Sequence, residues 1–297
     1  IEERNSDLAA SYVMQAASIQ PNNPGPQRFL GNLYRGQNNL SMAKQAYESS
    51  RLLMGEPNEI DPSYSNILLM LGHVETFSGD YKAARKIYDE SLEFIDFRQE
   101  PNLYQYPVFT YFYERDYDAA ILAFTRMRTR IVNSDLDQEW KTENITLMEE
   151  NLFVSYLHGG LEQKANQSLQ QLSAFFRTQL NTYLTSGASR EQLLTMKENN
   201  DIYLQSLRVW KEIVFSTSSI TPQLSRLKAL LEKNTNKTPS ALTPYHKYSG
   251  YAAFMSGDAE AAINHYSKVS NLEMDDDLYH SDFYALALRG NGDTEKS

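Results

Sequence analysis

Cysteine is absent from this chain of 297 residues. Without a thiol the chain has no disulfide scaffold, no thiolate zinc ligand and no cysteine nucleophile. The sequence also lacks an apolar run close to the roughly 20 residues that a membrane-spanning helix needs. A chain of this length can still bury a sizeable core without either feature.

Positive charge is in short supply. The chain has 28 lysines and arginines against 38 aspartates and glutamates, which gives a net charge of −10. An acidic surface repels phosphate backbones, so the composition argues against a nucleic-acid partner. The same charge is compatible with a basic partner, although it equally serves solubility.

Two stretches far apart in the sequence resemble each other. The phrase "FSGDYKAARKIYDESL" occupies residues 77–92, and "MSGDAEAAINHYSKVS" occupies residues 255–270. In each, a Gly-Asp pair is followed by an alanine and a tyrosine at helical spacing, which predicts a helix, a turn and a second helix. The shared positions are Gly79, Asp80, Ala84 and Tyr88 in the first copy, and Gly257, Asp258, Ala262 and Tyr266 in the second.

A third copy, "FLGNLYRGQNNLSMAKQAYESS", lies at residues 29–50. Antiparallel helices approach closely only where side chains are small, so we expect Gly31 to face Ala43, and Gly72 to face Ala84. The tyrosines at helical spacing would fill the gaps beside these contacts. One such helix pair cannot bury its apolar face alone, whereas several stacked pairs can.

This pattern resembles the tetratricopeptide repeat. The best instance is the set Leu30, Gly31, Tyr34, Ala43 and Tyr47, and the next is Leu71, Gly72, Gly79, Ala84 and Tyr88. The resemblance implies an all-α fold, a right-handed α-α superhelix built from helix-turn-helix repeats. Longer and less regular helix pairs are expected in the middle of the chain.

We expect three parts along the chain. Residues 1–132 are predicted to form an N-terminal array of repeats, and residues 241–297 a C-terminal one. Residues 133–240 are predicted to form longer, divergent helix pairs, because their helical stripes lack the Gly/Ala signature. In the third N-terminal repeat Pro107 falls inside the first helix, so that helix is expected to start late or to kink.

The chain is expected to start and end in the middle of a repeat. Residues 1–21 resemble a lone second helix, and the sequence stops where another second helix should begin. Ends without polar capping helices expose apolar faces. We therefore expect these ends to be covered by further segments, by another domain or by another copy in a homo-oligomer.

No enzyme signature stands out. The five histidines do not fall at metal-ligand spacings, and the phrase "GNG" at residues 290–292 lacks the strand of a phosphate loop. The acidic stretch "EMDDDLYHSD" at residues 273–282 could hold a divalent metal, or it could be the acidic start of a helix. The interpretation adopted is no catalysis, no metal and no cofactor.

Resemblance to the tetratricopeptide family implies a concave face, lined by the first helix of each repeat, that holds a peptide. Side chains one turn before and after the Leu-Gly pair would point into it. The predicted peptide-binding residues are Arg28, Asn32, Arg35, His73, Phe77, Tyr106, Phe109 and Tyr113.

The family's carboxylate clamp, which holds the C-terminus of a peptide, is mostly missing. Arg28 and Asn32 match its basic residue and first asparagine, with arginine in place of lysine. Met70 stands where a second asparagine is expected, and Asn102 and Tyr106 stand where two basic residues are expected. Instead, residues 104–117, "YQYPVFTYFYERDY", are dense in aromatic side chains, which either pack between helices or form the floor of the groove.

The sequence thus predicts a non-catalytic scaffold that binds a protein or peptide. The alternative is a regulatory or sensory domain of a larger multidomain protein, since bacterial arrays of this kind accompany envelope-assembly factors, kinases, cyclases and transcription regulators. A bacterial periplasm or envelope and a cytoplasm both remain open as the compartment.

Overall fold

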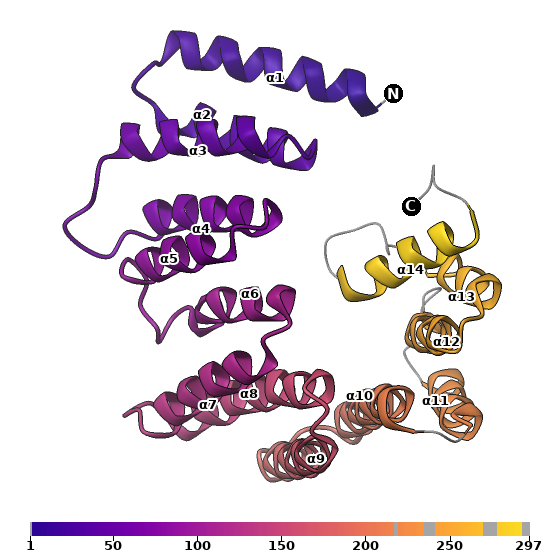
Figure 1. Cartoon of the computed structure of the whole chain (residues 1–297). Helices are drawn as coiled ribbons and strands as arrows, with labels where there is room; N and C mark the ends of the chain where they lie inside the picture. The colour runs from indigo at the N-terminus through magenta and orange to yellow at the C-terminus, as the bar shows by residue number, and fades with distance from the viewer. Residues whose placement is uncertain (1, 217–218, 235–240, 270–277, 293–297) are drawn as a thin grey trace. The chain divides into compact units, whose positions relative to one another are not determined.

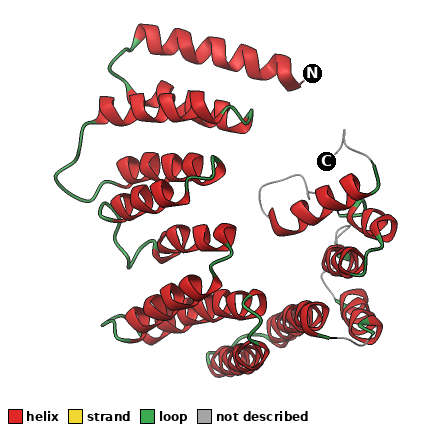
Figure 2. Ribbon diagram, in the orientation of Figure 1, coloured by secondary structure: helices red, strands yellow, loops and turns green. Residues whose placement is uncertain are grey.

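A computed structural model describes residues 2–216, 219–234, 241–269 and 278–292. Within these ranges all regular structure is helical, with fourteen α-helices and one 3-10 helix (Figure 2). The predicted all-α fold is confirmed. The chain divides into two compact units, residues 1–144 and 145–297.

In the first unit, consecutive helices pack against one another in chain order (Figure 1). They are α1 (Glu2–Ile19), α2 (Pro24–Gly36), α3 (Leu40–Met54), α4 (Pro62–Phe77), α5 (Tyr81–Leu92), η1 (Pro101–Gln105), α6 (Tyr106–Glu114) and α7 (Tyr117–Val132). The unit ends within α8 (Gln138–His158). The pairs α2/α3, α4/α5 and α6/α7 are the three predicted repeats. This stacking is the arrangement of an α-solenoid.

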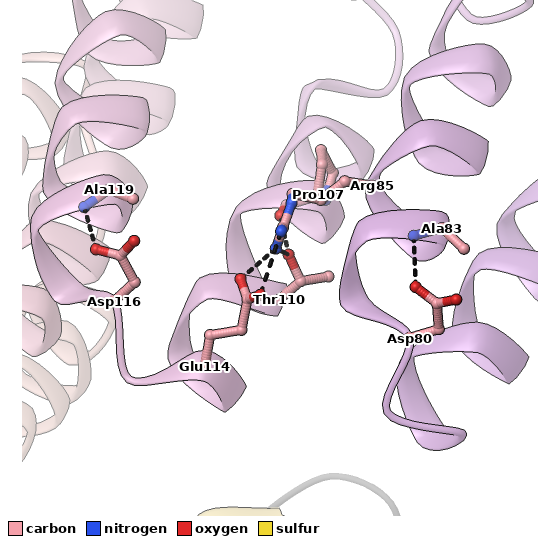
Figure 3. A network of polar contacts seen from close by, with 8 residues as sticks. All are labelled: Asp80, Ala83, Arg85, Pro107, Thr110, Glu114, Asp116 and Ala119. Atoms are coloured by element: carbon pink, nitrogen blue, oxygen red, sulfur yellow. Dashed lines mark hydrogen bonds and ion pairs between the residues drawn. The ribbon is translucent and has the colours of Figure 1, made fainter.

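The turn inside each repeat has a simple chemical basis. Gly79 adopts a φ of +83°, which only glycine takes without strain, and the next residue caps the following helix. The Asp80 carboxylate accepts a hydrogen bond of 2.9 Å from the Ala83 amide (Figure 3). In the third repeat Asp116 caps α7 in the same way, but Arg115, with a φ of +57°, stands in the place of the glycine.

Pro107 shortens α6 at its start. The preceding residues form η1, and α6 begins at Tyr106, so the proline lies in the first turn where its missing N–H costs nothing. The predicted late start is therefore confirmed.

The expected contact between small residues needs a correction. At Gly31 and Gly72 the nearest side chains are the rings of Tyr47 and Tyr88, not an alanine: an added Cβ would lie 2.4 Å from either ring. The glycines thus make room for a tyrosine that the second helix inserts between the two. A residue with a Cβ atom at either position would clash with the tyrosine ring, which explains why glycine stands there.

Ion pairs join neighbouring repeats. Arg85 on α5 contacts Thr110 Oγ1 at 2.8 Å and Glu114 Oε2 at 2.5 Å on α6 (Figure 3). Lys44 on α3, one position after the buried alanine like Arg85, pairs with the buried Glu75 on α4 at 2.5 Å. In the first two repeats, the residue after the alanine therefore links its repeat to the next one.

The second unit contains the remainder of α8 and six further helices: α9 (Glu162–Thr185), α10 (Arg190–Phe215), α11 (Thr221–Lys233), α12 (Thr243–Met255), α13 (Ala259–Tyr266) and α14 (Leu278–Gly290). With 21, 24 and 26 residues, α8, α9 and α10 are the longer helices expected in the middle. Phe153, Leu172 and Leu207 form their shared core.

The C-terminal copy of the repeat has the packing of the others. An added Cβ at Gly250 on α12 would lie 2.9 Å from the ring of Tyr266 on α13. The division into residues 1–132, 133–240 and 241–297 stays a prediction. Among the described helices, none is long and apolar enough to cross a membrane.

Candidate functional site

The predicted peptide-binding residues lie on the first helices of three consecutive repeats, α2, α4 and α6. We call this surface the A-helix face. It comprises Arg28, Asn32 and Arg35 on α2, His73 and Phe77 on α4, and Tyr106, Phe109 and Tyr113 on α6. Arg28, Asn32, Phe77 and Tyr113 are exposed, whereas the other four are half-buried.

His73 is the centre of this face. Its Nδ1 lies 2.7 Å from the hydroxyl oxygen of Tyr88, which reaches through from α5. The ring of Tyr106 meets the imidazole edge-on, with 4.8 Å between ring centroids, and stacks on Tyr88 at 5.8 Å. The structure thus brings His73 and Tyr106 together, and adds a tyrosine that the sequence analysis had assigned to packing.

Burial controls the charge of this cluster. Desolvation, with a smaller contribution from the positive charge of Arg35, lowers the pKa of His73 to about 4. Burial likewise raises the pKa of Tyr88 far above its usual value. At neutral pH the cluster is therefore uncharged, and Arg35 is the cation beside it.

The first repeat shows a related arrangement. The Tyr47 hydroxyl donates a hydrogen bond of 2.7 Å to Asn32 Oδ1. The Arg35 guanidinium lies close enough to the same hydroxyl to favour its ionised form, although burial has the larger effect and raises the pKa of Tyr47. Asn32 and Arg35 on α2 are thus linked through Tyr47. They belong to the repeat that precedes the one containing His73.

Phe109 and Tyr113 are more involved in packing. The Phe109 ring lies 6.1 Å from that of Phe124, which is fully buried in the third repeat. Tyr113 stacks on Tyr81 at the start of α5, with 5.8 Å between ring centroids and 7° between their planes. Part of the aromatic segment at residues 104–117 therefore packs between helices.

The second repeat of the first unit matches a known protein family. The tetratricopeptide repeat matches residues 65–95, which contain most of α4 and all of α5. The chain contains a tetratricopeptide repeat. No curated protein matches the chain.

Tetratricopeptide repeats are generally protein-interaction scaffolds and are typically non-catalytic. The matched repeat supplies His73, Phe77 and Tyr88 of the site described above. The family therefore indicates a protein partner for the chain.

Tyr47 and Tyr88 are candidate site residues that the sequence analysis did not include. Each lies 16 positions after a glycine, and each hydroxyl contacts the polar residue that follows that glycine, Asn32 or His73. The repeated spacing of glycine, polar residue and tyrosine was a usable signal. It indicates that the tyrosine of the second helix extends between the two helices, so that its hydroxyl contacts a polar residue of the first helix.

Other candidate features of the chain lie away from this face. Shallow cavities of about 450 Å³ and about 550 Å³ lie at the connections between repeats, and no residue of the A-helix face lines either one. In the larger cavity the Arg130 guanidinium already stacks on Phe97, 4.0 Å from the ring centroid. We interpret these cavities as packing irregularities between repeats.

Metal ligands do not cluster in the part of the chain that the structure describes: no group of three or more His, Asp or Glu side chains could hold an ion there. Among the histidines whose side chains are described, His246 and His265 form a pair whose Nδ1 atoms are 3.1 Å apart. The acidic stretch considered as a metal site, residues 273–282, lies outside the residues whose side chains are described.

Proposed function

We propose that the A-helix face of the first unit binds an extended peptide segment of a partner protein and performs no catalysis. The observation that carries this proposal is the cluster of His73, Tyr88 and Tyr106 beside Arg35. Aromatic rings next to an arginine are the side chains that dominate protein-binding hot spots.

The charges of the repeat array support the same surface. Among the described residues no carboxylate pairs with Arg28 or Arg35 on α2. By contrast, Lys44, Arg51 and Arg85 on α3 and α5 each pair with a carboxylate of the next repeat. The cations of the second helices thus hold repeats together, whereas those of α2 remain available for a partner.

An exposed apolar side chain extends the face by one turn. Phe77 lies four residues after His73 on α4, so both side chains share one side of the helix, and 48% of Phe77 is accessible to solvent. A bound peptide would cover this ring. Burial of an aromatic ring of this kind is a typical source of binding free energy.

A peptide-display selection tests the proposal. A random library would be selected on the immobilised protein, and the recovered peptides would be measured against wild type, Arg35→Ala and Phe77→Ala. Each substitution is expected to weaken binding by about 30-fold or more, because truncation of a hot-spot residue costs about 2 kcal/mol or more.

Leu52→Ala is the matched control, because Leu52 is 82% exposed and lies on α3, which is a second helix of a repeat and contributes no residue to the A-helix face. Its binding should equal that of wild type. Recovered peptides that bind Arg35→Ala and Phe77→Ala as tightly as wild type would place the interaction elsewhere and refute the proposal. The alternative role as a regulatory domain of a larger protein would use the same surface and stays a prediction.

A further inference from the structure

A chain of hydrogen bonds determines which nitrogen of His73 carries the proton. Thr76 Oγ1 lies 2.9 Å from the carbonyl oxygen of Gly72, which can only accept, so the Thr76 hydroxyl donates there. Tyr88 Oη lies 3.1 Å from Thr76 Oγ1, and Thr76 has no second proton, so Tyr88 donates to it. The remaining contact, 2.7 Å from Tyr88 Oη to His73 Nδ1, then requires an N–H on Nδ1.

The opposite arrangement leaves one contact without a proton. If Tyr88 donated to His73, then Tyr88 Oη and Thr76 Oγ1 would face each other as two acceptors in a largely buried site. Burial also keeps the imidazole neutral, with a pKa of about 4. A neutral ring with its proton on Nδ1 has a lone pair on Nε2, so His73 presents an acceptor there.

This acceptor is available to a ligand. Within the described part of the chain no hydrogen-bond partner is found for His73 Nε2. The atom is also not among the fully buried polar atoms that lack a partner, so it is at least partly accessible to solvent. It does so on the A-helix face, close enough to Arg35 to be affected by that charge.

The preceding repeat presents the opposite polarity. Asn32 uses its carbonyl oxygen to accept from Tyr47, which leaves the side-chain NH₂ group as a donor. The guanidinium of Arg35, one turn further along α2, can only donate. Helix α2 therefore offers donors where α4 offers an acceptor.

We propose that Asn32 or Arg35 together with His73 recognise an amide group of the bound peptide, from its main chain or from an Asn or Gln side chain. The amide carbonyl would accept from α2, and the amide N–H would donate to His73 Nε2. This inference rests on the proposed function. A peptide carboxylate would satisfy Arg35 but has no hydrogen to donate to His73, so an amide is the better match.

The tautomer of His73 can be tested without any peptide. Nitrogen-15 NMR of the histidine rings, with assignment by comparison to His73→Gln, distinguishes a protonated Nδ1 from a protonated Nε2. The account predicts that Nδ1 of His73 carries the proton at neutral pH. A proton on Nε2 would overturn the inference, whether or not peptides bind.

Recognition of the amide can be tested on a peptide from the display selection. His73→Asn retains an amide N–H near the Nδ1 position and removes the outer acceptor, whereas His73→Gln places a carbonyl oxygen near the Nε2 position. The peptide should bind His73→Asn roughly 3- to 10-fold more weakly than wild type, the loss expected for one hydrogen bond. His73→Gln should retain most of the affinity, and circular dichroism would confirm that both variants fold.

An N-methyl scan of the same peptide completes the test. Methylation at one amide should weaken binding to wild type and to His73→Gln, yet change little for His73→Asn, because its acceptor is already lost. If Phe77→Ala weakens peptide binding, but N-methylation has the same effect on wild type, His73→Asn and His73→Gln, the inference fails and the proposed function survives. If no peptide is recovered, the proposed function fails and the amide recognition fails with it.

Discussion

The ring of Tyr88 lies directly against Gly72, on the neighbouring antiparallel helix. A Cβ atom at position 72 would lie 2.4 Å from the ring, well inside any real contact distance. The same relationship joins Tyr47 to Gly31 in the preceding repeat. Because the Tyr88 hydroxyl also bonds His73, this contact connects the packing of the repeat to the candidate binding face.

Gly72→Ala should therefore destabilise the protein strongly. The fully packed tyrosine must move or the helices must separate, and overpacking of this kind costs about 1–3 kcal/mol. The measurement is the free energy of unfolding from urea denaturation. Gly36→Ala is the control, because nothing lies within 4 Å of its Cβ position at the end of α2, and it should change stability by less than about 1 kcal/mol. Equal effects at the two glycines would contradict this account.

Arg115→Gly should stabilise the protein. Arg115 occupies the left-handed conformation, with a φ of +57°, that Gly79 takes in the preceding repeat. A non-glycine residue there costs about 1–2 kcal/mol, so glycine should recover on the order of 1 kcal/mol after its greater freedom in the unfolded chain is considered. The reverse change, Gly79→Arg, should lower the melting temperature. A lower melting temperature for Arg115→Gly would show that the turn is not strained.

The ion pair of Arg85 and Glu114 should couple the second repeat to the third. Both side chains are partly buried, and the guanidinium also contacts Thr110 and lies 4.5 Å from the ring centroid of Tyr111. A double-mutant cycle with Arg85→Met and Glu114→Gln should give a coupling of about 0.5–1 kcal/mol. The exposed pair of Lys197 and Asp201 should give less. A coupling of zero for Arg85 and Glu114 would show that this ion pair does not stabilise the contact between the two repeats.

Stability should fall on acidification through His158. Burial lowers its pKa to about 4, below the value of 6.5 that it has when unfolded, so the unfolded chain binds the proton first. The contribution is complete above pH 6.5 and is lost progressively as the pH falls toward 4, which amounts to about 2 kcal/mol by pH 5.

His158→Gln is the test of this pH dependence. Between pH 7 and pH 5 the variant should lose about 2 kcal/mol less of its unfolding free energy than wild type, since carboxylate titration is common to both. Trp210, whose ring centroid lies 5.8 Å from that of His158, provides a local fluorescence probe of the same titration. Identical pH dependence of the two proteins would contradict the assigned cause.

The sequence predicted the helix pairs because their signals are local. Gly79 and Asp80 end one helix and start the next whatever surrounds them, and the alanines and tyrosines recur at helical spacing. The sequence could not predict which neighbours each aromatic side chain packs against. Tyr106 and Phe109 are three residues apart, yet Tyr106 packs against His73 and Tyr88 while Phe109 contacts the buried Phe124, because helix rotation is set by tertiary packing.

The side chain that packs against the repeated glycine also could not be predicted from local sequence patterns. Ala43 and Ala84 are fully buried as expected, but the space beside each glycine is taken by a tyrosine 16 positions away. Small residues mark where helices approach, and they do not identify the side chain that enters. For the same reason the role of Tyr88 in holding His73 emerged only from the three-dimensional arrangement.

The most direct measurement of the central claim is where a selected peptide lies on the protein. A photo-crosslinking amino acid would replace Phe77 on the A-helix face in one variant and Leu52 on α3 in another, because both positions are exposed. The account predicts that a display-selected peptide crosslinks at position 77 and not at position 52. Crosslinking at position 52 alone would contradict binding at the A-helix face.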